Sequence, residues 1–223
     1  MTKSPSAVEL DRLQKSLTPQ MKRWGFKVRG RTFNRTTDDG LTQVVNLQAG
    51  ASDPPGTTYI PGLRENLHGW FTVNLGVYVP EVAKHHGGCE AGTFVREYHC
   101  CVRARLGSIG PEEKDLWWTI ACTPSLLAEV EERLRREALP YLDRHASRDS
   151  ILRACAASED ACGLGGGPAR IVAAVILTER GDKDEARALL ARQVQEQQNP
   201  GHSSYVRSLA EKLGLGALQI DDA

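Results

Sequence analysis

The sequence predicts an α+β protein with an N-terminal helix, an antiparallel sheet of about five strands, and a helical C-terminal half containing a helical hairpin. Apolar residues recur at helical spacing near the N-terminus, alternate with polar residues through the middle, and return to helical spacing after Thr123. The 223 residues are 40% hydrophobic and 25% charged, which is ordinary for a globular protein that buries its own core.

The first element is an amphipathic helix. The residues that mark its apolar stripe are Leu10, Leu13, Leu17, Met21 and Trp24. Ser4 or Ser6 can cap its start, and Gly25 stands where a glycine commonly ends a helix. Because proline lacks a backbone N–H, Pro19 predicts a kink or a break into two helices.

Period-two alternation then predicts a sheet that is dry on one face and polar on the other. The alternating segments are residues 26–31, 45–48, 71–79, 98–106 and 116–120. Helical patterns follow, with a capping Thr123 before Pro124, and Pro140 is expected to start a further helix. Gly181 between two periodic segments predicts the helical hairpin.

The chain divides, on these patterns, into a sheet domain, a connecting segment and a small helical cap. The boundaries are 1–148, 149–167 and 168–223. The connecting segment holds GLGGGPAR, which invites a phosphate-loop reading. Such a loop needs a strand before it and a Gly-Lys-Ser/Thr ending, whereas here a helical pattern precedes and Pro168 follows. We therefore interpret it as a linker.

Four stretches carry a resemblance to a known family: WGFKVRGRTFNR, VVNLQ with FTVNLGVYVPE, YHCCVRARLG, and LPYLDRHAS. Residues 7–148 resemble the bacterial family called domain of unknown function 4304. The resemblance implies an α+β domain of bacterial origin and implies no reaction. The segment KHHGGCEAGTFVREYH departs from the family pattern, so the resemblance does not account for it.

Two surfaces are candidates for binding. If helices cover the apolar sheet face, the polar face is open or covered only by loops; its side chains are Asn46, Asn74, His99, Arg103, Arg105 and Trp117. A buried amide needs hydrogen bonds, so Asn74 either ties two strands together or faces a ligand. The second surface is KRWGFKVRGRTFNR, with six positive side chains and no negative one, where Arg29 and Arg31 share a predicted strand face.

Histidines and cysteines gather in KHHGGCEAGTFVREYHCC, residues 84–101, and raise the question of a metal. Four ligands are available in His86, Cys89, His99 and Cys101, but structural zinc sites usually present two close ligand pairs, and no C-x-x-C pair occurs here. We expect no cofactor, with zinc as the weaker alternative. No Gly-x-Ser-x-Gly or His-Glu-x-x-His motif suggests catalysis.

The favoured function is therefore non-catalytic binding of another protein in the bacterial cytoplasm, for example as an antitoxin-like or immunity-like module. The N-terminus lacks a signal-peptide core and no run is long enough to span a membrane. A net charge of zero argues against nucleic acid as the partner. The alternative is a small-ligand-binding domain or enzyme with a pocket around Asn74, His99, Arg103 and Trp117.

Overall fold

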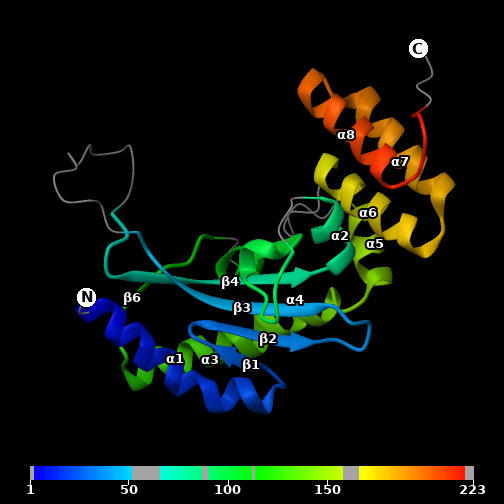
Figure 1. Cartoon of the computed structure of the whole chain (residues 1–223). Coiled ribbons are helices and arrows are strands. Elements are labelled where there is room, and N and C mark those ends of the chain that lie inside the picture. The colour runs from blue at the N-terminus through cyan, green and yellow to red at the C-terminus, as the bar shows by residue number, and fades with distance from the viewer. Residues whose placement is uncertain (1–2, 52–65, 87–89, 112–113, 158–165, 219–223) are drawn as a thin grey trace.

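The computed structural model describes residues 3–51, 66–86, 90–111, 114–157 and 166–218. A six-stranded antiparallel sheet forms the centre of the N-terminal part, and further helices stack beyond one end of that sheet (Figure 1). This confirms the predicted α+β class. Within the described residues, no helix is both long and apolar enough to cross a membrane.

The first helix, α1 (Pro5–Arg23), runs unbroken through Pro19. Ser4 caps its start by accepting a hydrogen bond from the Ala7 N–H at 3.2 Å. Gly25, with φ +86°, ends it, and the Phe26 N–H bonds the Met21 carbonyl across this turn. The expected break at Pro19 is wrong, because apolar residues on both sides of the proline pack into the same core.

The sheet contains β1 (Lys27–Arg29), β2 (Thr32–Thr36), β3 (Thr42–Ala49), β4 (Trp70–Tyr78), β5 (Val102–Arg105) and β6 (Trp118–Thr119). The first five strands pair in chain order, and β6 pairs with the start of β4. The predicted single strand at residues 26–31 is wrong, since β1 and β2 form a tight hairpin whose turn is Gly30-Arg31. Phe71, Val73, Leu75 and Val77 of β4 all face the main core.

The chain next forms α3 (Pro124–Arg133), the π-helical turn η3 (Leu134–Ala138) and α4 (Leu139–Arg144). The Thr123 hydroxyl caps the start of α3. Pro140 stands in the first turn of α4, as expected, although α4 follows η3 without a gap. A π turn widens the helix just before the proline ring, where a regular turn would clash. Together with α1, this helix covers the apolar sheet face.

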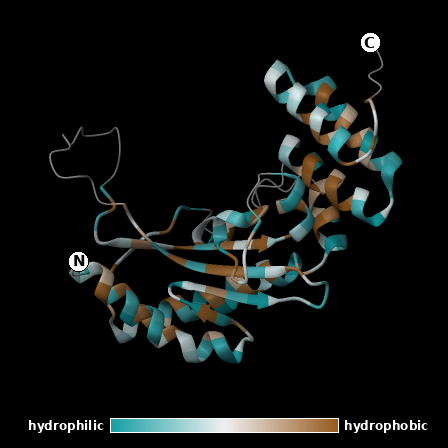
Figure 2. Cartoon of the chain, viewed as in Figure 1, coloured by the Kyte–Doolittle hydropathy of each residue, from teal (hydrophilic) through white to brown (hydrophobic). Residues whose placement is uncertain are grey.

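The helical part consists of α5 (Arg148–Ala157), α6 (Gly166–Arg180), α7 (Lys183–Glu196) and α8 (Pro200–Lys212). α6 and α7 form the predicted hairpin around Gly181. Residues 171–177 of α6 are all buried, as is typical of a helix at the centre of a helical bundle. The same helix is largely brown, that is hydrophobic, in Figure 2. α6 also packs on α2 (Pro80–His85), the short helix after β4, so the apolar core is continuous from the sheet into these helices.

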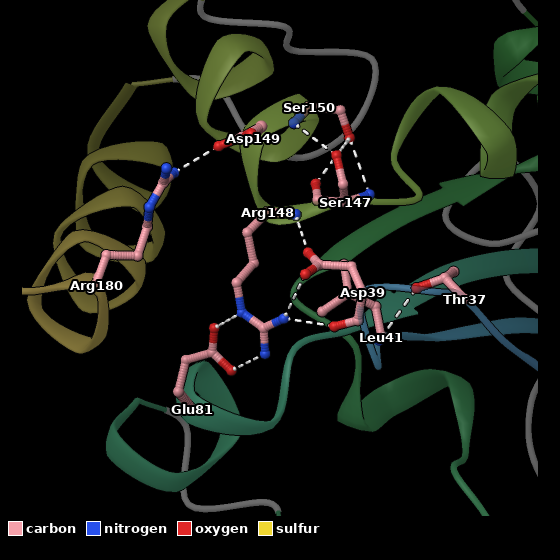
Figure 3. Close-up of polar contacts among 9 residues, drawn as sticks. All are labelled: Thr37, Asp39, Leu41, Glu81, Ser147, Arg148, Asp149, Ser150 and Arg180. Carbon is pink, nitrogen blue, oxygen red and sulfur yellow. Dashed lines mark hydrogen bonds and ion pairs between the residues drawn. The ribbon is translucent and has the colours of Figure 1, made fainter.

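A polar joint ties the start of α5 to the sheet region (Figure 3). The Arg148 guanidinium donates to both carboxylate oxygens of Glu81 on α2, at 2.6 and 2.9 Å. It also donates to the Asp39 carbonyl at 2.6 Å, and the Arg148 backbone N–H bonds the Asp39 carboxylate. The hydrogen bond that Arg148 donates to Glu81, opposed by burial, raises the pKa of Arg148, so this cation is firmly held. The division at residue 148 stays a prediction.

Candidate functional site: the polar sheet face and the basic edge

One row of polar residues crosses the sheet: Thr32, Asn46, Asn74 and Arg105 lie opposite one another on β2 to β5. The row is bonded internally. The Asn46 amide donates to the Thr32 hydroxyl at 2.9 Å, and the Asn74 amide donates to the Gln48 side chain on β3. Asn74, only 5% exposed, therefore ties two strands together, as the first of its two interpretations predicts.

Residues 90–100 cover one end of this face. The Asn34 side chain donates to the Val95 carbonyl at 3.0 Å and accepts from the Val95 N–H at 2.8 Å, as a neighbouring strand would. The Arg96 guanidinium reaches the Thr32 hydroxyl, and Tyr78 accepts from the Ala91 N–H. A second apolar cluster, containing Val44, Tyr78, Ala83, Val95 and Cys100, forms beneath this segment. Residues 90–100 are thus a structural cover for the sheet.

The predicted strand at residues 98–106 is wrong in its first half. Residues 97–99 form the 3₁₀ turn η1 (Glu97–His99), and β5 begins only at Val102. The Arg96 backbone N–H donates to His99 Nδ1 at 3.0 Å, a local side-chain bond that competes with strand pairing. His99 and Cys101 therefore do not share a strand face with Arg103 and Arg105.

Arg103 and Arg105 both have acidic partners. Arg103 pairs with Glu97, and Arg105 pairs with Asp115 while lying 5.2 Å from the centre of the Trp117 ring. Trp117 donates to the same Asp115 carboxylate at 3.0 Å. Burial raises the pKa of Asp115, but the hydrogen bonds from Arg105 and Trp117 outweigh it and hold that pKa below its ordinary value. This triad is closed on itself, so its charges are largely neutralised.

The basic stretch splits into one structural and one free part. The prediction that Arg31 shares a strand face with Arg29 is wrong, because Arg31 lies in the β1–β2 turn. Its guanidinium bonds Asp11 at 2.8 Å and the Ala7 carbonyl at 2.9 Å, which fastens the hairpin to α1. Arg29 is exposed at the sheet edge. Together with Lys22, Arg23 and Lys27, also exposed, it forms what we call the basic edge.

Two of the three aromatic residues of this stretch are buried, whereas Trp24 is partly exposed. Phe26 and Phe33 are 2% and 1% exposed, and the Arg35 guanidinium lies over the Phe26 ring at 4.9 Å. Stacking of single-stranded nucleic acid needs exposed rings beside the cations. Phe26 and Phe33 therefore cannot stack on the bases of a nucleic acid bound at the basic edge.

The proposed metal ligands are only partly brought together. Cys89 lies outside the described residues, while His86, His99 and Cys101 line one pocket. Among the residues that the structure describes, no three His, Cys, Asp or Glu side chains could jointly hold a metal ion. Burial raises the pKa of Cys101 to about 12 and that of Cys100 well above its ordinary value, so both thiols stay protonated at neutral pH. Protonated thiols are poor ligands and poor nucleophiles.

A chain without zinc therefore stays our prediction. Protein purified without an affinity tag is expected to contain less than about 0.2 equivalents of zinc, and a chelator should leave its melting temperature unchanged. Elemental analysis and a thermal melt check both statements. Stoichiometric zinc that a chelator removes together with stability would contradict them.

The two pocket histidines predict a loss of stability in acid. Burial, followed by the nearby His202, lowers the pKa of His86; burial, followed by the charge of Arg96, lowers that of His99. The folded state thus favours neutral rings. This stabilisation is complete above the unfolded histidine pKa of about 6.5 and is lost as pH falls through the lower folded values.

Urea unfolding between pH 7.5 and 5 measures this effect. The double variant His86→Gln/His99→Gln is expected to show a flatter stability profile than the parent protein, whereas His68→Gln, a change at an exposed histidine, keeps the parent slope. Identical slopes in all three proteins would refute the assignment.

The pocket that contains His99 differs from the alternative pocket of the sequence analysis. His99 lines a pocket with α2 and α6 residues, and Asn74, Arg103 and Trp117 are not among the residues that line it. The acidic partners Glu97 and Asp115 were missed because neither adjoins its arginine in sequence. Lys22, Arg23 and Lys27 belong to the basic stretch that the sequence analysis identified. The structure shows that these three cations are exposed.

Comparison with known proteins gives one match. No similar protein was found among those with curated descriptions, and no similar structure among those solved. A family model matches residues 64–144, a region that includes β4, α2, β5, β6, α3 and α4 but not the basic edge. Residues 64–144 are therefore similar to the domain described as "Domain of unknown function (DUF4304)", which confirms the resemblance over that region.

Proposed function

We propose that the protein is a non-catalytic interaction module that binds an acidic, extended segment of another protein along the basic edge. One observation carries the proposal. Lys22, Lys27 and Arg29 make no ion pair with any described residue, and Arg23 reaches only the Gln20 side chain. By contrast, Arg31, Arg103 and Arg105 are each held by an acidic side chain.

The backbone of β1 supports the same partner chemistry. β1 ends the order of the sheet, and no described strand pairs with its outer side. An extended peptide can add to such an edge through main-chain hydrogen bonds. Lys27 and Arg29 lie opposite Asn34 and Thr32 and so share the polar sheet face, where acidic side chains of an added strand would meet them. Charged edges also prevent aggregation, so the proposal needs a direct test.

The wider setting is part of the proposal. We place the module in the bacterial cytoplasm, acting without a cofactor, with protein rather than nucleic acid as its partner. The buried Phe26 and Phe33 rings support the choice of protein. The antitoxin-like or immunity-like role stays a prediction, and a toxin-like neighbouring gene would favour it.

The test is a titration of ¹⁵N-labelled protein with a short peptide of alternating Glu and Val. It is expected to shift the amides of β1, with affinity that falls as salt rises. A Lys/Val peptide should not bind. Reversing the four charges (K22E, R23E, K27E and R29E together) should weaken binding by roughly ten-fold or more.

The matched control reverses four other exposed cations, Arg153, Lys183, Arg207 and Lys212, which also have no ion pair among the described residues. This variant should bind the Glu/Val peptide as the parent does. Equal loss in both variants, or shifts confined to β4 and β5 with none in β1, would overturn the proposal. Binding of a thymidine oligonucleotide at the same edge, tighter than the peptide, would favour nucleic acid instead.

A further inference from the structure

A pocket of about 220 Å³ lies where α2, the segment from η1 to β5, and α6 meet. Figure 1 shows that α2 and α6 lie away from β1, the strand of the basic edge. The apolar wall of the pocket comes from Val82 of α2 and from Pro168 and Val172 of α6. This space has room for a ligand of one ring with a small substituent.

The described residues that line the pocket carry no permanent charge. None of them is Asp, Glu, Lys or Arg. Its two thiols are already committed, since Cys100 Sγ donates to the Arg96 carbonyl at 3.7 Å and Cys101 Sγ to the Val77 carbonyl at 3.8 Å. Removing a charged ligand from water into such surroundings is costly, so the lining selects for an uncharged molecule.

Three aromatic rings belong to the described lining: His86, Tyr98 and His99. Tyr98 is 62% exposed, although large apolar rings are usually more buried, and its ring centre lies 4.4 Å from that of His99 in an edge-on arrangement. Offset and edge-on ring pairs are favourable, so a flat ligand gains more here than a bulky saturated one.

Hydrogen-bonding capacity remains on the two imidazoles. His99 Nδ1 accepts from the Arg96 N–H, so the neutral ring carries its proton on Nε2 as a donor. His86 Nδ1 is paired with the Tyr205 hydroxyl from α8 at 2.5 Å, which leaves His86 Nε2 as the second polar atom. Neutral imidazoles match the lowered pKa values of both histidines.

We propose that this pocket binds a small, uncharged, planar ring compound with a hydrogen-bonding substituent, contacting Tyr98 and His99 on one side and α6 on the other. This inference is independent of the function proposed for the basic edge. It also differs from the earlier alternative pocket, from which it keeps only His99.

The probe is nicotinamide, a flat neutral ring with an amide. Two matched compounds accompany it: nicotinate, which replaces the amide by a negative carboxylate, and cyclohexanecarboxamide, which keeps the amide and removes the flat ring. In amide-detected NMR, nicotinamide is expected to shift Cys100, Cys101 and Val172 with a dissociation constant on the order of 1 mM. Each matched compound should bind at least roughly ten-fold more weakly.

Two variants locate the site. Tyr98→Ala changes an exposed ring and should weaken nicotinamide binding by roughly five-fold without unfolding the protein. Trp70→Ala removes another exposed ring, 38% exposed on β4 and not in the lining, and should leave binding unchanged. His99→Gln tests the hydrogen-bonding side of the pocket and should also weaken nicotinamide binding.

The proposal is overturned if nicotinamide causes no shifts up to about 20 mM. It is equally overturned if all three compounds bind alike, or if Tyr98→Ala and Trp70→Ala have the same effect. The proposed function is read from β1 amides and a charged peptide, so its success or failure does not alter these results.

Discussion

Replacing Arg148 with methionine is expected to lower the free energy of unfolding by about 2–3 kcal/mol. The Arg148 guanidinium bonds both oxygens of Glu81 and the Asp39 carbonyl, and the Glu81 side chain is only 10% exposed. Without the cation, that carboxylate stays largely buried with its main partner gone, and an unpaired buried charge is costly. Urea unfolding followed by circular dichroism measures the change.

Arg180→Met is the matched control. Arg180 also joins two helices, through Asp149, but the two side chains are 40% and 62% exposed. Solvent screens such a pair, so its loss should change stability by no more than about 0.5 kcal/mol. Adding Glu81→Gln to Arg148→Met should recover part of the loss, because it removes the stranded charge. If Arg148→Met and Arg180→Met lose equal stability, Arg148 is an ordinary surface residue.

Gly76→Ala is expected to destabilise the protein by about 2–3 kcal/mol. A Cβ at Gly76 of β4 would lie 2.7 Å from both Cβ and Sγ of Cys100, and 3.3 Å from the Val102 carbonyl oxygen. The first atom is close to the backbone, so the segment covering the polar face must move as a whole. Denaturant unfolding gives the loss, and faster reaction of Cys100 with a thiol reagent reports the displaced cover.

Gly92→Ala controls for the general effect of replacing a glycine. Gly92 lies in the same covering segment, but a Cβ there would meet nothing within 4 Å. Its replacement should leave stability within about 0.5 kcal/mol of the parent. The pair Gly76→Ala/Cys100→Gly should be more stable than the sum of its single changes predicts, because it relieves the clash. Additive losses would contradict a direct contact between the two positions.

Local pattern was sufficient for much of the fold. The apolar spacing of α1, the alternation along β4 and the hairpin of α6 and α7 each place their residues on a buried face in the structure. Prediction failed where a local contact overrode the pattern. Residues 98–101 alternate like a strand, but the bond from the Arg96 N–H to His99 Nδ1 closes a turn instead. No periodicity records such a bond.

The candidate site was predicted less well than the fold. Arginine is a residue type common at binding sites, but Arg31, Arg103 and Arg105 pair with acidic side chains that lie 20, 6 and 10 residues away in the chain. Which arginine is neutralised depends on those pairings. The sequence alone could identify the basic stretch, but not that its free charges are Lys22, Arg23, Lys27 and Arg29.

The sequence by itself determined the α+β class, the polar and apolar sheet faces, and the absence of recognisable catalytic motifs, because each depends on the order of residues along one element. Tertiary structure alone decided that residues 90–100 cover one end of the polar face, that Gly76 makes room for Cys100, and that Arg148 joins the helices to the sheet. These features depend on contacts between distant segments, whose geometry the spacing of residues within one segment does not encode.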